Sequence, residues 1–184
     1  MKVVLLYESS EAPAAALRDT LVRLCASCGD ELRVVDASEA ALKPCTGCFG
    51  CWIRTPGICI HTADGGAAFL KKLVDADRFV IASRITWGGY SLRIKGYIDR
   101  IIPLSHPYFR KENGEMHHVR RYPSSATVFA AGYGALDVLE ESTFRDCVSS
   151  NRDNVAGNCR EAVCIIDDAN SDACAFWLER EVLA

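Results

Sequence analysis

Lys2-Val3-Val4-Leu5-Leu6-Tyr7 forms a nearly unbroken apolar run at the start of the sequence, and this run decides the fold. A strand with one face in water would alternate polar and apolar residues, because successive side chains point to opposite faces of a sheet. A run that is apolar throughout is typical of a strand buried between two layers of helices in a parallel sheet. A helix is predicted directly after it, over residues 13–28, with Gly29 as its end.

The same succession of strand and helix continues along the chain. Further strands are predicted at residues 31–36, 78–83, 126–131 and 162–166, and further helices at residues 67–75, from 91 to 103, from 136 and from 172. Repeated strand–helix units imply right-handed crossovers and a parallel sheet with helices on both faces. We therefore predict an α/β, doubly wound, five-stranded parallel sheet with the flavodoxin-like strand order 2-1-3-4-5.

Size and composition narrow the function classes. A chain of 184 residues with 49% hydrophobic and 24% charged residues is ordinary globular material, and we expect one domain over residues 1–184. The net charge of −3 argues against a nucleic-acid partner. The apolar runs are too short to cross a bilayer, and the start shows no secretory pattern. We expect a cytoplasmic protein without a membrane partner.

The chain has ten cysteines, which in a reducing compartment indicate metal ligation or redox work rather than disulfides. The densest stretch is Pro44-Cys45-Thr46-Gly47-Cys48-Phe49-Gly50-Cys51, followed by Cys59, within a cysteine-rich loop at residues 44–60. Its spacing is C-x2-C-x2-C-x7-C. Bacterial ferredoxins supply three ligands of an iron–sulfur cluster from such a run, whereas zinc sites are usually built from two separated pairs. The spacing favours a cluster, with zinc or free thiols as alternatives.

Ligands of doubly wound sheets bind beyond the carboxyl ends of the strands, where we expect three loops to meet. These are residues 8–12, 84–90 and 132–135, the last with Tyr133 and Gly134. Because the cysteine loop follows the second strand, we expect it at the same edge. In the middle loop, Gly88 and Gly89 would let the backbone approach an isoalloxazine ring on which Trp87 and Tyr90 could stack. The alternative is a tight loop with two interface aromatics.

The loop after the first strand is a weaker candidate for a phosphate site. Ser9 and Ser10, with the start of the following helix, could hold a phosphate. Glu8 and Glu11 flank them, and their charge opposes a phosphate. The alternative is that Ser10 caps the helix.

The cysteine run, then Gly57-Ile58-Cys59, Ala76-Asp77, Trp87-Gly88-Gly89, and Lys95 with Asp99-Arg100 resemble the iron–sulfur flavoproteins of the NADPH-dependent FMN reductase superfamily. The resemblance covers roughly residues 1–135, and the cysteine run is its most specific part. It implies a flavodoxin-like fold, FMN, a 4Fe–4S cluster and a dimer or higher oligomer.

Carried over by position, the resemblance makes Cys45, Cys48, Cys51 and Cys59 the cluster ligands. It sets Thr86, Trp87, Gly88, Gly89 and Tyr90 against the flavin ring and Ser9 and Ser10 in the phosphate loop. The chain departs from the family at Glu8-Ser9-Ser10-Glu11-Ala12-Pro13, where members usually carry an Arg and further Ser or Thr. It also has Arg84 and Thr86 where a Pro and a Tyr are common.

Other candidates are weaker. Cys25 and Cys28 are expected in the core of the first helix. The aromatic and basic stretch at residues 104–125 is expected to be an irregular loop that covers the flavin, receives a nicotinamide dinucleotide or forms an oligomer contact. Asp99-Arg100 is expected to be a salt-bridged helix end that orients the flavin loop. No side-chain nucleophile or general base is predicted.

These inferences predict an FMN-dependent redox protein that couples a flavin to a 4Fe–4S cluster, with NAD(P)H or a redox partner protein as electron donor. We expect a homo-dimer or homo-tetramer. One alternative is an NAD(P)H-dependent FMN or quinone reductase without a cluster. Another is a non-catalytic flavodoxin-like module with a structural zinc site.

Overall fold

The computed structural model describes residues 1–39, 42–112, 114–123, 126–155, 163–166 and 171–184. Its elements in chain order are β1 (Lys2–Tyr7), α1 (Ala12–Cys28), β2 (Glu31–Asp36), α2 (Gly50–Ile53), α3 (Gly66–Leu73), β3 (Arg78–Thr86), β4 (Gly89–Tyr90), α4 (Leu92–Asp99), a 3-10 turn (Ile102–Leu104), β5 (Ser105–Glu112), β6 (Glu115–Arg120), β7 (Thr127–Tyr133), α5 (Val138–Val155), β8 (Val163–Ile166), α6 (Ser171–Trp177) and a π-helical turn (Leu178–Val182). Within these ranges, no helix is both long and apolar enough to span a membrane.

The main sheet has the order β2-β1-β3-β7-β8, and every neighbouring pair on this path is parallel. The α/β flavodoxin-like fold with a parallel sheet is thereby confirmed, and the path follows the order predicted for the parallel strands. The predicted count of five was incomplete. Strand β4 pairs antiparallel with the end of β3, so the sheet has six strands within the described residues.

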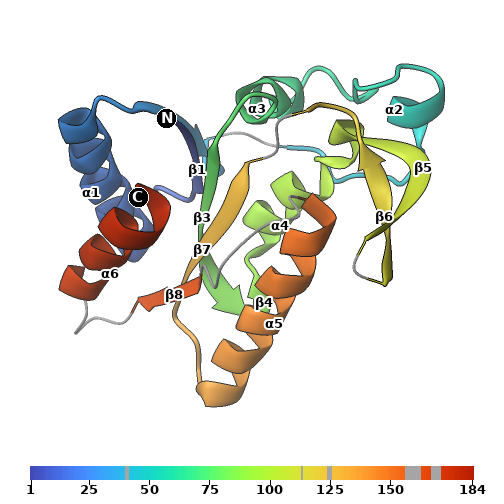
Figure 1. Ribbon diagram of the computed structural model, residues 1–184. Coiled ribbons are helices and arrows are strands. Elements are labelled where there is room, and N and C mark those ends of the chain that lie inside the picture. Colours follow the sequence, from blue (N-terminus) through green and yellow to red (C-terminus); the bar gives the residue numbers. More distant parts are fainter. Residues whose placement is uncertain (40–41, 113, 124–125, 156–162, 167–170) are drawn as a thin grey trace.

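Helices cover both faces of this sheet, as the apolar run in β1 requires (Figure 1). Val4 and Leu6 point to one face, where they join a core cluster with residues of α3, α4 and α5. Val3 and Leu5 point to the other face and pack with residues of α1, α6 and the π-helical turn. Consecutive residues of β1 therefore lie in two separate cores, and all four are fully buried.

The stretch at residues 104–125 differs from the prediction of an irregular loop. It contains the antiparallel pair β5 and β6, which forms a two-stranded sheet apart from the main one. Phe109 on β5 lies opposite His118 on β6, and their rings stack with centroids 4.7 Å apart. The ring of His118 also contacts the ring of Trp52 in α2 at 4.7 Å. The hairpin thus packs against the cysteine loop.

The cysteine loop lies at the opposite edge of the sheet from the one predicted. We call the edge where the parallel strands begin the amino edge and the edge where they end the carboxyl edge. Figure 1 shows α2 beyond the amino edge, whereas β4 lies at the carboxyl edge. Ser38 lies at the end of β2, where its N–H donates to Asp36, whereas Leu42 packs against the core cluster on the α4 side and Lys43 accepts a hydrogen bond from Arg100 at the end of α4. The prediction of one shared edge was wrong because it placed the cysteine loop directly at the end of β2.

Helix α4 spans the distance between the two edges. It starts directly after β4 at the carboxyl edge, and residues 99–103 at its end line the cysteine pocket. Its 8 residues extend over about 12 Å at 1.5 Å per residue. The two regions predicted to bind cofactors therefore lie at opposite ends of one short helix.

Candidate functional site

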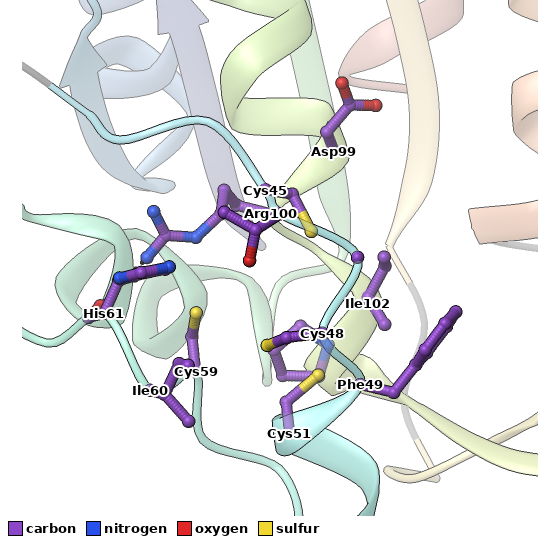
Figure 2. Close-up of a pocket in the computed structure, with 13 residues that line it drawn as sticks. Cys45, Cys48, Phe49, Cys51, Cys59, Ile60, His61, Asp99, Arg100 and Ile102 are labelled. Atoms are coloured by element: carbon purple, nitrogen blue, oxygen red, sulfur yellow. Dashed lines mark hydrogen bonds between the residues drawn. The ribbon is translucent and has the colours of Figure 1, made fainter.

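The four cysteines of the C-x2-C-x2-C-x7-C run line a single pocket (Figure 2). Cys45 and Cys48 lie in the extended chain before α2, Cys51 lies within α2, and Cys59 comes from the returning arm. Figure 2 shows their sulfur atoms around a common space between the two arms. The structure therefore brings the four predicted ligands together.

Two backbone features allow the first arm to curve around this space. Gly47 and Phe49 both have positive φ, of 64° and 53°, which reverses the chain direction between consecutive cysteines. Gly50 is buried, and a Cβ there would lie 2.8 Å from Ile60 and 3.6 Å from the sulfur of Cys48. A side chain at position 50 would thus fill the space between the arms.

The thiols interact with one another and with the backbone. A hydrogen bond from the Gly50 N–H is the main cause that lowers the pKa of the Cys48 thiol. Burial raises the pKa of the Cys51 thiol, and the charges of Cys59, Cys45 and Cys48 raise it further. Four thiolates in one pocket repel each other unless a positively charged group binds them.

The residues present fit a 4Fe–4S cluster. A cubane cluster takes one cysteine thiolate at each iron, so its four sulfur ligands stand around a volume rather than around a point. The pocket offers four thiols, which is the donor set that such a cluster uses. In the described part of the chain, no three or more His, Cys, Asp or Glu side chains form a group that could hold a metal ion as they stand.

Arg100 anchors both arms of the cysteine loop and was not among the predicted site residues. Its side chain is 1% exposed and forms an ion pair with Asp64 at 2.6 Å. It also donates to the carbonyl of Lys43 at 2.6 Å and to the carbonyl of His61 at 2.9 Å. Lys43 precedes the first cysteine ligand and His61 follows the last, so one guanidinium fixes both ends of the loop.

The electrostatics of this ion pair are favourable despite its burial. The hydrogen bond from Arg100 lowers the pKa of Asp64 to about 2. Burial disfavours the charged guanidinium, but hydrogen bonds to Asp64 and Cys59 more than compensate and raise the pKa of Arg100. A permanent positive charge therefore lies next to one of the four sulfurs. Asp99 pairs with Lys95, so both residues of this helix end form ion pairs, as predicted. Both residues line the cysteine pocket, and their predicted role toward the flavin loop stays a prediction.

An aromatic wall closes the pocket on the hairpin side. Trp52 stacks on Phe49 with centroids 4.9 Å apart and contacts His118 on β6. Its indole N–H donates to the carbonyl of Ile102 at 3.2 Å. A hollow of about 530 Å³ lies along this wall and includes Cys45, Arg120 and Ser105 in its lining. The wall covers one side of the pocket, while Cys48 stays exposed, and it borders a space large enough for a planar ligand.

At the carboxyl edge, Thr86, Trp87, Gly88, Gly89 and Tyr90 form a tight turn between β3 and β4. Trp87 and Gly88 have positive φ, of 52° and 71°. Trp87 is 90% exposed, so its ring is available to a ligand. Tyr90 is buried, and its ring packs edge-on against Phe144. The stacking role predicted for the Tyr90 ring is therefore wrong, since that ring lies in the core.

Tyr133 and Gly134 lie at the end of β7, beside the guanidinium of Arg84. Burial, followed by the charges of Glu11 and Glu8, raises the pKa of the Tyr133 hydroxyl. A hollow of about 610 Å³ opens here between α1, β7 and β8. Its lining includes Tyr133, Gly134 and Arg84 together with apolar residues of the first turns of α1. The predicted role of Tyr133 and Gly134 toward a cofactor stays a prediction.

The loop after β1 does not fit a phosphate group. The amide of Ser9 donates to Asp36 at 3.1 Å, and the amide of Ser10 donates to the hydroxyl of Ser38 at 3.3 Å. The hydroxyl of Ser10 also pairs with that of Ser38, so Ser10 does not cap α1. Glu11 occupies the N-cap position without a side-chain capping bond. The polar groups that would receive a phosphate are engaged within the protein.

Of the remaining cysteines, Cys174 lines the hollow between α1, β7 and β8, whereas Cys25, Cys28, Cys147 and Cys164 are in the lining of neither this hollow nor the cysteine pocket. Cys25 is buried in α1, and burial raises the pKa of its thiol to about 11. Cys28 is exposed, which corrects its predicted place in the core. Cys174 is buried, and Cys147 and Cys164 are half-buried. Cys159 lies outside the described residues.

Comparisons with known proteins agree with the resemblance drawn from the motifs. No model of a protein family matches the chain. The chain is 33% identical over 76 residues to an iron-sulfur flavoprotein of Methanocaldococcus jannaschii. The matched segment covers 41% of this chain and 38% of that protein. It is 29% identical over 94 residues to an iron-sulfur flavoprotein of Archaeoglobus fulgidus, covering 50% of this chain and 41% of that protein. The matched segments thus span about two fifths of these relatives.

Solved structures with the same fold cover nearly the whole chain. The NAD(P)H:quinone oxidoreductase from Methanothermobacter marburgensis superposes with a TM-score of 0.64 at 15% identity, covering 97% of this chain and 95% of that one. An FMN-dependent NADH-azoreductase from Bacillus anthracis, in complex with FMN, gives a TM-score of 0.59 at 10% identity, covering 96% and 93%. At these identities the likeness shows the fold. The two sequence matches carry the name of the iron–sulfur flavoproteins that the motifs resemble.

Proposed function

We propose that this protein is a flavin-dependent oxidoreductase that couples a flavin at the carboxyl edge to a 4Fe–4S cluster in the cysteine pocket. The observation that carries the proposal is the convergence of Cys45, Cys48, Cys51 and Cys59 on one pocket beside the buried guanidinium of Arg100. The similarity to two iron-sulfur flavoproteins supports the cluster. The fold shared with quinone reductases and azoreductases supports the flavin.

In this proposal the four cysteines are the only cluster ligands, and the other residues of the pocket tune and protect the centre. The cluster supplies single-electron transfer, whereas a flavin accepts two electrons as hydride or one at a time. Arg100 offsets the negative charge of four thiolates, which favours the reduced state. Trp52 and His118 exclude water from one side. These roles need no nucleophile and no general base.

At the carboxyl edge the exposed ring of Trp87 and the backbone of Gly88 and Gly89 would contact the flavin ring. A nicotinamide dinucleotide is the proposed hydride donor, as in the reductases with the same fold. A redox partner protein is the alternative donor. The proposed protein is one cytoplasmic domain that assembles as a homo-dimer or homo-tetramer, without nucleic acid or membrane partners.

The test is anaerobic purification followed by measurement of iron, labile sulfide and bound flavin. Absorption in the visible range and about four irons and four sulfides per chain are expected. Cys48→Ser should abolish iron binding, whereas Cys28→Ser, which alters an exposed cysteine remote from the pocket, should leave iron unchanged. Iron at the wild-type level in Cys48→Ser would contradict the ligand assignment.

A cluster-free NAD(P)H-dependent flavin or quinone reductase fits the fold equally well, because the solved structures with those activities cover nearly the whole chain. The same measurements separate the two functions. Bound flavin and NAD(P)H oxidation without iron or sulfide in anaerobically prepared protein would establish the cluster-free enzyme. About one zinc per chain without flavin would instead indicate a structural zinc module.

A further inference from the structure

The loop after β1 is the place where this chain departs most from a phosphate-binding site. A phosphate loop needs free backbone N–H groups, free hydroxyls and an excess of positive charge. Here the polar groups of Ser9, Ser10 and Ser38 form a network around the carboxylate of Asp36. Burial alone would raise the pKa of Asp36, but the hydrogen bonds from Ser9 and Ser38 lower it. The donors that a phosphate would need are therefore engaged by a carboxylate of the protein and by one another.

Negative charge around the loop further disfavours the binding of a phosphate. Glu8 is 7% exposed and accepts a hydrogen bond from the hydroxyl of Ser91. Arg93 approaches Glu8 only to 3.9 Å. Together with Glu11 and Asp36, Glu8 gives the loop three carboxylates. A phosphate monoester carries nearly two negative charges, and each carboxylate within a few ångströms weakens its binding.

Of the guanidinium groups near the loop, that of Arg84 is already neutralised. Arg84 at the end of β3 donates to Glu11 through Nε at 3.2 Å and through Nη2 at 2.9 Å. This fork-like contact uses the donors that a phosphate would need. The first turn of α1 also contains Pro13, which has no N–H to offer. The start of α1 therefore lacks the donors and the charge of an anion site.

The rest of the carboxyl edge remains suitable for an uncharged ring. Trp87 is exposed on the turn between β3 and β4, and a hollow of about 610 Å³ that reaches Arg84 of β3 is lined largely by apolar residues of α1, β7 and β8. Its size falls within the range of small-molecule sites, about 300–1,000 Å³. We propose that the carboxyl-edge site selects an isoalloxazine ring without a 5′-phosphate, such as riboflavin, over FMN. This inference rests on the proposed flavin chemistry and names the ligand of that site.

The test is fluorescence titration of the anaerobically purified, flavin-free protein with riboflavin and, separately, with FMN. Riboflavin should bind on the order of tenfold more tightly than FMN, and added salt should narrow the difference because it screens the carboxylates. Glu11→Gln releases Arg84, so it should raise the affinity for FMN severalfold and leave riboflavin binding unchanged. Asp19→Asn is the matched control, since it removes one carboxylate of α1 that pairs with Arg18.

The outcomes separate this inference from the proposed function. Tighter binding of FMN than of riboflavin by the wild-type protein would overturn the inference and leave the flavin-dependent function standing. An FMN-to-riboflavin ratio in Glu11→Gln equal to that in Asp19→Asn would also overturn it. Binding of neither flavin by folded protein would overturn both proposals.

Discussion

Arg100 and Asp64 form an ion pair at 2.6 Å whose side chains are only 1% and 4% exposed. The pair joins the end of α4 to the arm that follows Cys59. Because Arg100 also holds the carbonyl of Lys43, the geometry of the cysteine pocket depends on this one contact. Removing either partner would leave a buried charge without its counterion, which is more costly than losing the pair as a whole.

Arg100→Gln should destabilise the protein by about 3–5 kcal/mol and lower the iron content per chain. The reason is that Asp64 would remain buried and both arms of the loop would lose their anchor. Arg54→Gln removes the same charge from an exposed position of the same loop and should change stability by less than about 0.5 kcal/mol. Urea unfolding and iron analysis measure both effects. Equal results for the two variants would contradict the anchoring role.

The ion pair also predicts a pH dependence of stability. The pKa of Asp64 is about 2 in the folded protein, below its ordinary value of 3.8. Its contribution to the free energy of unfolding is therefore fully present above pH 3.8 and is lost as pH falls through about 2. The loss amounts to about 2 kcal/mol. Chemical unfolding of iron-free wild-type protein should show it, and Asp64→Asn should lack this component.

Gly66 makes room for the guanidinium of Arg100. A Cβ at position 66 would lie 2.6 Å from Nη2 of Arg100. Gly66→Ala should destabilise the protein by about 1–3 kcal/mol, because the buried ion pair leaves Arg100 little freedom to move. Gly96→Ala is the control, since a Cβ there meets nothing within 4 Å. It lies inside α4 and should stabilise the protein by about 0.5–1 kcal/mol. Thermal unfolding should show a lower midpoint temperature for Gly66→Ala and a higher one for Gly96→Ala.

Gly88 has two reasons to be glycine. Its φ is +71°, and a Cβ would lie 2.5 Å from the side chain of Thr143 on α5. Gly88→Ala should therefore cost more stability than Gly114→Ala, where φ is +90° but the surroundings are open. Gly114→Ala is the control: it introduces backbone strain of about 1–2 kcal/mol but no steric clash with a neighbouring side chain. Gly88→Ala should also weaken flavin binding, because Trp87 is the adjacent residue of the turn. An equal loss of stability in the two variants would contradict this prediction, because it would mean that the Thr143 side chain can move away from the new Cβ at no cost in free energy.

The alternation of apolar strands and amphipathic helices was sufficient to predict the fold. The run in β1 could be read from sequence because burial on both faces demands apolar residues at consecutive positions. The hairpin β5–β6 was missed because its strands face a separate small sheet and carry aromatic and charged residues without a regular alternation. The count of the main sheet was also incomplete, since β4 has only 2 residues.

The candidate sites were also predictable only in part from the sequence. The spacing of Cys45, Cys48, Cys51 and Cys59 identified the four thiols that line one pocket. The sequence could not indicate that Asp64 would pair with Arg100, because these residues lie far apart in the chain and only α4 brings them together. The sequence also could not indicate the position of the Tyr90 ring. Its place in an aromatic-rich loop predicts a stacking residue, but in the folded chain the ring packs against Phe144 in the core.

What the sequence determined by itself is local: which segments are buried strands, which four cysteines share one pocket, and which loop carries carboxylates beside its serines. The tertiary structure alone decided which edge of the sheet each loop occupies, how α4 separates the cysteine pocket from the carboxyl edge, and which charges neutralise each other. The physical reason is that burial and spacing act between neighbours in the chain. Ion pairs such as Arg100 with Asp64 and Arg84 with Glu11 depend on distances that only the folded chain fixes.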